Sequence, residues 1–233
     1  MTKKVFAVLD IETLTDARLA FDIAWILYDS KGNELERHNY LVKEIVESPF
    51  FELLLSRDSF IKNKSDYYFD GLDSCEFEIL SLEEISYRFY EAESRYDAKI
   101  VMCAYNARFD FNALNNNLLH YTGDMLFFDE QDIEICDIMT IAMSTICDTN
   151  KYVRWCLLNS MTTEKGNVKT NAQTVYAYLT NNVDYVEEHH ALADCEIEAQ
   201  ILFKARKRKQ KLHKKFAMPI CHCPEWKQVQ SRI

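Results

Sequence analysis

Glycine and proline are scarce in this sequence, which has only 4 glycines and 3 prolines among its 233 residues. Flexible linkers between domains are rich in these residues, and no stretch of this chain has that composition. We therefore expect one folded domain over residues 1–215 and a short C-terminal tail over residues 216–233. Apolar residues make up 48% of the chain, which is enough to form a substantial core.

The sequence also lacks the patterns of a transmembrane segment and of a secretory signal. No apolar run reaches the length of about 18 residues that a membrane span needs. The short apolar run that follows Lys3 and Lys4 already contains an acidic residue at Asp10, unlike the apolar region of a signal peptide. We therefore predict a cytoplasmic protein with no membrane contact.

The eight cysteines are scattered along the chain. Several lie in apolar runs, such as Cys103 within residues 101–104, which is typical of reduced thiols packed as small hydrophobic side chains. A zinc site is the alternative, and its candidate ligands are Cys195, His213, Cys221, His222 and Cys223. Their spacing departs from the gaps of about two to four residues between paired zinc ligands, which favours incidental thiols.

The formal net charge of −10 is unfavourable for a protein that coats long stretches of nucleic acid, because such binding depends on many Lys and Arg contacts to phosphates. It is compatible with an enzyme that holds only a strand end, or with carboxylates gathered around bound cations. A basic cluster near the C-terminus is interpreted first as a solvated helix end and second as a phosphate-contacting patch. The cluster comprises Lys204, Arg206, Lys207, Arg208, Lys209, Lys211, Lys214 and Lys215.

Strand patterns followed by alternating strands and helices predict an α/β fold. Residues 5–13, 24–28 and 36–42 are expected to be consecutive strands, with a hairpin turn at residues 29–33. Residues 44–80 have no clear period and are expected to contain helical pieces and loops.

The second half of the chain opens with a predicted capping box, Ser81 to Glu84, and apolar residues at helical spacing follow it. The remaining expected elements are a strand at residues 100–104, a helix from about Arg108, an apolar run at residues 133–141, and helices near residues 170–179 and 190–211. The alternation of strands and helices implies that these strands are parallel.

Two carboxylates lie at the end of the first strand. Side chains alternate across a strand, so Asp10 and Glu12 should point to one face and Ile11 to the other. An apolar strand tolerates two neighbouring negative charges poorly unless a divalent cation binds them. Mg²⁺ or Mn²⁺ with oxygen ligands would satisfy this need.

Two further acidic positions lie at predicted helix starts. Asn106 follows a strand and suits a helix N-cap, which would hold Asp110 in the first turns of the next helix. Asp194 follows His189 and His190 at the start of the last helix. A histidine beside a carboxylate can accept a proton from water near neutral pH.

These three clusters, in this order, resemble the three motifs of the DEDDh family of 3′→5′ exonucleases. The matching residues are Asp10-Ile11-Glu12, then Asn106 with Phe109 and Asp110, then His189, Ala191 and Asp194. The motifs span residues 10–194, most of the chain. The sequence around Lys169, Thr170, Tyr176 and Glu187 is similar to that of small phage or prophage exonucleases. This similarity implies a protein in the cytoplasm of a phage host.

The resemblance implies a ribonuclease H-like fold, with a mixed sheet of about five strands flanked by helices. It implies that Asp10, Glu12, Asp110 and Asp194 bind two Mg²⁺ or Mn²⁺ ions, and that His189 is the general base. The implied substrate is a nucleic-acid 3′ end, single-stranded DNA first, from which nucleoside 5′-monophosphates are released. The sequence does not indicate an oligomeric state.

Several alternatives remain open at this point. RNA could be the substrate, as in oligoribonuclease or RNase T, or the chain could be an inactive nucleic-acid-binding or polymerase-associated subunit. Helical geometry favours His190, four residues before Asp194, whereas the family spacing favours His189. Asp137 is a candidate fifth carboxylate of the site, but its position favours a strand end or a group that supports a metal ligand. Leu14 stands where the family often has glycine, which leaves the contacts to the terminal sugar undefined.

Overall fold

The computed structural model describes residues 3–14, 18–57, 65–74, 76–129 and 132–208. The predicted tail and its boundary at residue 215 lie outside the described residues. The same holds for His213, Cys221, His222 and Cys223 of the alternative zinc site, and for the basic residues beyond Arg208.

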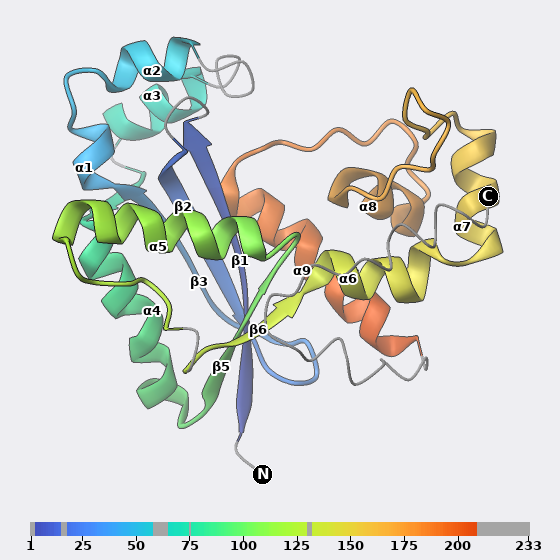
Figure 1. Ribbon diagram of the computed structural model, residues 1–233, viewed down its shortest axis with the longest axis horizontal. Coiled ribbons are helices and arrows are strands. Elements are labelled where there is room, and N and C mark those ends of the chain that lie inside the picture. Colours follow the sequence, from blue (N-terminus) through green and yellow to red (C-terminus); the bar gives the residue numbers. More distant parts are fainter. Residues whose placement is uncertain (1–2, 15–17, 58–64, 75, 130–131, 209–233) are drawn as a thin grey trace.

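A six-stranded mixed sheet forms the centre of the protein, in the order β4-β3-β2-β1-β5-β6 (Figure 1). The strands are β1 (Lys4–Leu14), β2 (Leu19–Tyr28), β3 (Glu34–Val42), β4 (Glu78–Leu80), β5 (Lys99–Ala104) and β6 (Glu134–Asp137). Strands β1 to β3 form an antiparallel meander, while β4, β5 and β6 pair in parallel with their neighbours. The predicted α/β class and the parallel second half are confirmed.

Helices cover both faces of this sheet. They are α1 (Lys43–Val46), α2 (Phe51–Arg57), α3 (Ser65–Asp73), α4 (Leu82–Tyr96), α5 (Arg108–Thr122), α6 (Ile138–Ala142), the π-helical turn η2 (Met143–Cys147), α7 (Asn150–Leu158), α8 (Ala172–Thr180) and α9 (Ala191–Lys207). Figure 1 shows α4 and α5 on one side of the sheet and α6, α8 and α9 on the other.

The central strand β1 divides its side chains between two hydrophobic cores. Val5, Ala7 and Leu9 belong to the core beneath α4 and α5, whereas Val8 belongs to the core beneath α8 and α9. This alternation follows from the two-residue period of a strand. It directs the even-numbered positions of β1 toward α9, which packs on β1 and β2.

The predicted local signals at the helix α4 and at the first hairpin are confirmed. Glu84 donates its backbone N–H to Ser81 Oγ at 3.2 Å, and the Glu84 carboxylate accepts the Ser81 N–H at 2.9 Å, so the capping box is complete. In the hairpin, the carboxylate of Asp29 accepts backbone N–H groups from Lys31 and Asn33 at 2.8 and 2.9 Å. Both motifs are local, and the sequence predicts them for that reason.

The prediction that Asn106 is an N-cap is wrong. The N-cap of α5 is Ala107, and no side-chain hydrogen bond caps the helix there. Asn106 adopts a left-handed conformation, with φ of 67°, and its carbonyl accepts the N–H of Phe109 at 2.8 Å. Asparagine tolerates this conformation better than most residues, so the same residue type serves a tight turn here.

Two other stretches differ from the expectation. Residues 44–80 contain helical pieces as predicted, but they end in the short strand β4, which adds a sixth strand to the predicted five. The apolar run at residues 133–141 is split between β6 and α6, and the strand ends at Asp137 as predicted.

The five cysteines in the described part of the chain, Cys103, Cys136, Cys147, Cys156 and Cys195, are free thiols. Four of them are buried, as predicted for small hydrophobic side chains. Among the described residues, no helix has both the length and the apolar character needed to cross a bilayer.

Candidate active site

Strand β1 presents its two carboxylates to the face covered by α9. Ile11 is buried in the core beneath α4 and α5, so its neighbours Asp10 and Glu12 point to the opposite side of the sheet. Asp10 pairs with Ala24 and Glu12 pairs with Asp22 of β2, directly before a register shift that follows Glu12. The predicted orientation of these side chains is confirmed.

The start of α9 presents the third motif. His189 has a left-handed backbone, with φ of 51°, and His190 is extended and forms the N-cap. Helix α9 begins at Ala191, and the N–H of Asp194 donates to the carbonyl of His190 at 3.1 Å. His189 therefore lies just outside the helix, while Asp194 is buried in its first turn.

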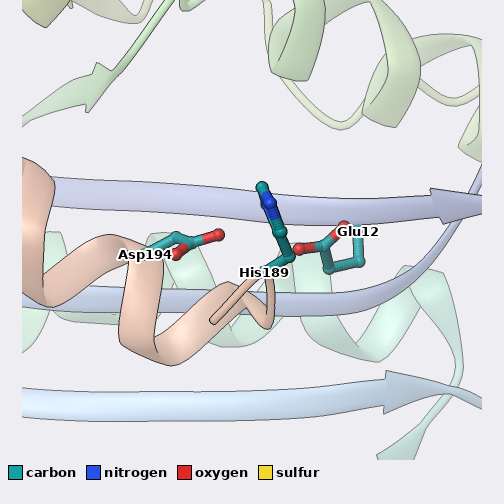
Figure 2. A group of neighbouring side chains, drawn as sticks. All are labelled: Glu12, His189 and Asp194. Atoms are coloured by element: carbon teal, nitrogen blue, oxygen red, sulfur yellow. The ribbon is translucent and has the colours of Figure 1, made fainter. Parts of the chain in front are cut away.

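Glu12, His189 and Asp194 form a group of potential metal ligands. Each offers one ligand atom, and these three atoms all lie within 4.8 Å of one another. Figure 2 shows Glu12 entering from β1 and Asp194 from α9, with His189 between the two carboxylates in this view. Glu12 is at least 177 positions from the other two residues in the chain, so the fold brings distant segments together at this point.

Asp10 is partly exposed and lies beside this group, but it does not belong to the set of ligand atoms that are all within 4.8 Å of one another. Burial raises the pKa of Asp10 well above its usual range. Neighbouring negative charges raise this pKa further, and they belong to Glu198, Asp110, Glu12 and Asp194. Every one of these neighbours is a carboxylate, and such a cluster of negative charges is the kind of group that can bind a cation.

Asp110 lies in the first turn of α5 and is only 3% exposed. Burial raises the pKa of Asp110 well above its usual range, and the charge of Asp137 adds to this, whereas a hydrogen bond to the backbone of Ile11 opposes it. That hydrogen bond ties the second motif to β1 between Asp10 and Glu12. Asp110 is therefore next to the first motif, and its charge acts on Asp10.

Asp137, the last residue of β6, is the N-cap of α6. Its carboxylate accepts the N–H of Thr140 at 3.2 Å and caps α6. Burial raises the pKa of Asp137, and hydrogen bonds from the first turn of α6 and from the backbone of Asn106 oppose the effect of burial. These contacts favour the interpretation of Asp137 as a support for the turn that precedes Asp110.

The two histidines have different surroundings. The His189 side chain is 44% exposed, and its Nδ1 lies 3.8 Å from the Glu187 carboxylate. The His190 side chain is 18% exposed, its Nε2 lies 2.8 Å from the Glu188 carboxylate, and its ring stacks on Tyr67 with 4.6 Å between centroids. His190 is therefore held against α3, whereas His189 faces Glu12 and Asp194.

Glu198 is a buried carboxylate of the site that the sequence interpretation missed. It is 3% exposed and accepts the N–H of Tyr105, the residue after β5, at 3.0 Å. Burial raises the pKa of Glu198 well above its usual range, and the charges of Asp110 and Asp194 add to this effect. Glu198 lies four residues after Asp194 on the same face of α9, and this spacing was the available signal.

Asp22 is the second missed residue, and it is completely buried. It accepts hydrogen bonds from the Tyr68 hydroxyl at 2.9 Å, from the Asn39 amide, and from the backbone N–H of Ala191 at 3.2 Å. Burial raises the pKa of Asp22, and these three hydrogen bonds oppose the effect. An aspartate inside an apolar strand was the sequence signal for this position.

Comparisons with known proteins identify the fold. No protein-family model and no curated protein sequence matches the chain. Among solved structures, the zinc-bound complex of E. coli exonuclease I with single-stranded DNA is similar, with a TM-score of 0.56 and 14% identity over 91% of this chain and 42% of that one. Exonuclease I from Methylocaldum szegediense has a TM-score of 0.54 and 17% identity, over 89% and 41% of the two chains.

Exonuclease X in complex with 5′-overhanging duplex DNA is a third similar structure. Its TM-score is 0.50, with 16% identity over 91% of this chain and 97% of that one. The fold is therefore the ribonuclease H-like fold of these exonucleases, as predicted, with six strands in the sheet. The chain spans about two fifths of the exonuclease I chains that it resembles.

Proposed function

We propose that this protein is a 3′→5′ exonuclease that releases nucleoside 5′-monophosphates from the 3′ end of DNA, with a preference for single strands. The observation that carries the proposal is the meeting of Glu12, His189 and Asp194 within 4.8 Å, beside Asp10 and the buried Asp110. The similar solved structures are exonucleases, two of them described in complex with DNA. At this level of identity they support the fold, and the chemistry rests on the residues.

The acidic residues fit a divalent-cation site. The charged neighbours that raise the pKa of Asp10 are all carboxylates, and oxygen donors suit Mg²⁺ or Mn²⁺. Asp10, Glu12, Asp110 and Asp194 would hold the cations, two in number as the resemblance implies. When bound, such cations lower the pKa of a water ligand and stabilise the negative charge of a leaving 3′ oxygen.

His189 is assigned the role of general base. One of its ring nitrogens lies within 4.8 Å of an oxygen of Glu12 and of an oxygen of Asp194, its side chain is partly exposed, and the Glu187 carboxylate is near Nδ1. A carboxylate near one ring nitrogen orients the imidazole and leaves the other nitrogen for proton transfer. Attack of the deprotonated water on the terminal phosphodiester then gives a nucleoside 5′-monophosphate and a strand with a new 3′ hydroxyl.

The test is digestion of 3′-terminal substrates by the purified protein. Matched oligonucleotides labelled at the 5′ end, as single-stranded DNA, duplex DNA and RNA, are incubated with Mg²⁺, with Mn²⁺ or with EDTA. We expect ladders that shorten from the 3′ end with either cation, fastest on single-stranded DNA, and none with EDTA. Glu12→Gln and Asp194→Asn should abolish digestion, whereas a substitution of the exposed Glu164 to Gln should not.

Each of the other possible outcomes would assign this protein a different function. Faster digestion of RNA than of DNA would make the protein an RNA exonuclease that uses the same carboxylates, since the metal chemistry does not depend on the sugar. Binding of oligonucleotides without digestion under any metal condition would identify an inactive binding or polymerase-associated subunit. The phage or prophage origin, suggested by the sequence around Tyr176, stays a prediction.

A further inference from the structure

A buried aspartate outside the proposed metal ligands connects three elements near the start of α9. Asp22 of β2 is completely buried, and its three hydrogen-bond donors come from β3, α3 and α9. The donors are the side-chain amide of Asn39, the hydroxyl of Tyr68 and the backbone N–H of Ala191. All three are neutral groups, so they satisfy the oxygen lone pairs of Asp22 and do not neutralise its charge.

The bond from Ala191 is the one that reaches the candidate active site. Ala191 is the first residue of α9, and the first N–H groups of a helix have no acceptor within the helix itself. Asp22 supplies that acceptor from a strand 169 residues earlier in the chain. A negative carboxylate at a helix N-terminus also interacts favourably with the helix dipole.

The residues directly before Ala191 form the turn that presents His189. His189 has φ of 51°, a conformation that is unfavourable for a residue other than glycine and that persists only when its surroundings hold it. His190 follows as the extended N-cap, and Tyr67 of α3 stacks on its ring. Tyr67 thus contacts this turn directly through His190, and Tyr68 is connected to it through Asp22.

Asp22 is also in register with a proposed metal ligand. It pairs with Glu12 across β1 and β2, at the last position before the register shift. The strand that carries Glu12 and the helix that carries Asp194 are therefore joined through one carboxylate. We propose that Asp22 is a positioning residue that holds the turn at residues 189–191, so that His189 faces Glu12 and Asp194. This proposal rests on the proposed nuclease function.

The central test is Asp22→Asn, which keeps the shape of the side chain but replaces one acceptor oxygen with an NH₂ group. At least one of the three donors then faces another donor. We expect a folded protein whose kcat on single-stranded DNA is lower by about 10- to 100-fold, the range typical of groups that orient the residues of a site. The KM for DNA should be unchanged, because Asp22 does not contact the substrate.

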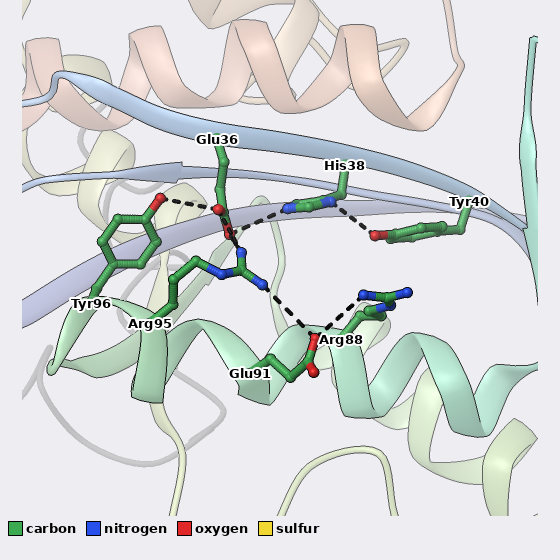
Figure 3. Close-up of polar contacts among 7 residues, drawn as sticks. All are labelled: Glu36, His38, Tyr40, Arg88, Glu91, Arg95 and Tyr96. Carbon is green, nitrogen blue, oxygen red and sulfur yellow. Dashed lines mark hydrogen bonds and ion pairs between the residues drawn. The ribbon is translucent and has the colours of Figure 1, made fainter.

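The matched control is Glu36→Gln. Glu36 of β3 accepts hydrogen bonds from Arg95 and Tyr96 and lies 3.2 Å from His38, so it is also a carboxylate with several partners (Figure 3). It pairs with Leu27, whereas Leu41 pairs with Asp22, which puts the two carboxylates five residues apart along the sheet. That separation is roughly 17 Å. We expect this variant to have a wild-type kcat.

Amide hydrogen exchange supplies a measurement that does not depend on nuclease activity. In Asp22→Asn the acceptor of the Ala191 N–H is at best a neutral amide oxygen, so this hydrogen bond is weaker than the bond to the carboxylate. The Ala191 N–H should therefore exchange at least about tenfold faster, because a first-turn N–H has no other acceptor in the helix. Exchange in Glu36→Gln should match the wild type. If Ala191 exchange is unchanged in Asp22→Asn, or if its kcat equals that of Glu36→Gln, the proposal is wrong.

A second variant keeps the proposal testable if Asp22→Asn does not fold. Ala191→Pro removes the same N–H, and proline is accepted at the first position of a helix after an extended residue such as His190. We expect a similar loss of kcat, and a folded Ala191→Pro with wild-type kcat would contradict the proposal. If the wild-type protein digests no substrate, the proposed function fails, while the Ala191 exchange rate still decides whether Asp22 holds the turn.

Discussion

The carboxylates of the candidate site should destabilise the protein when no cation is bound, and Glu12→Gln measures this directly. The ligand atoms of Glu12 and Asp194 lie within 4.8 Å of each other. Two ionised carboxylates at this separation repel by about 3 kcal/mol when the effective dielectric constant is about 20. Glu12 is partly exposed, and solvent screening reduces the expected relief to roughly 1–2 kcal/mol.

The assay is urea unfolding at pH 8, once with EDTA and once with excess Mg²⁺. In EDTA, we expect Glu12→Gln to have the larger free energy of unfolding, because the substitution removes one of the repelling charges. With Mg²⁺ the order should reverse, because the wild type gains the free energy of cation binding. Glu164→Gln, at an exposed position, should match the wild type in both conditions. A Glu12→Gln variant that is less stable than the wild type in EDTA would refute the reasoning.

Three further predictions follow from the same contacts. Because burial and neighbouring carboxylates raise the pKa of Asp10 and Glu198, the unfolded chain loses these protons first as the pH rises above about 4. The metal-free protein should therefore be less stable at pH 8 than at pH 5 in urea unfolding, and the opposite trend would contradict the pKa directions. His189→Ala should lower kcat on single-stranded DNA by at least about 100-fold, and His190→Ala by much less, so a near-normal rate in His189→Ala would overturn the assignment. Trp25→Ala should cost about 3–5 kcal/mol of stability, because Trp25 is 1% exposed and packs against Phe89; a loss below about 1 kcal/mol would contradict this.

The parts of the fold that the sequence predicts are those encoded by neighbouring residues. The alternation of β1, the capping box at Ser81 and the turn after Tyr28 each depend on residues within a few positions of one another. The α/β class followed from local strand and helix patterns along the chain. The structure confirms each of these predictions.

The features that the sequence did not predict depend on contacts between distant segments. Strand β4 is only three residues long, with exposed side chains at Glu78 and Ile79, and it is a strand because it pairs with the end of β3. No period of 2 is visible over such a short segment. The sequence also did not predict the π-helical turn η2 and helix α7, which lie between α6 and α8.

The residues of the candidate site fall into the same two groups, those that the sequence predicts and those that depend on contacts between distant segments. The motif residues Asp10, Glu12, Asp110, His189 and Asp194 could be assembled from spacing and resemblance. The structure brings ligand atoms of Glu12, His189 and Asp194 within 4.8 Å of one another. Asp22 and Glu198 could not be assembled in this way, since their partners Ala191 and Tyr105 are 169 and 93 residues away in the chain. The role of a buried carboxylate depends on the group that donates a hydrogen bond to it, and that partner is known only from the structure.

Helix α9 links all three acidic motifs, and buried carboxylates make two of the links. Asp22 binds the N–H at the start of α9, in register with Glu12 on β1. Glu198, one turn after Asp194, binds the N–H of Tyr105 at the start of the turn that leads to Asp110. Carboxylates used as hydrogen-bond acceptors add negative charge next to the proposed ligands, so the connections that shape the site also strengthen its attraction for cations.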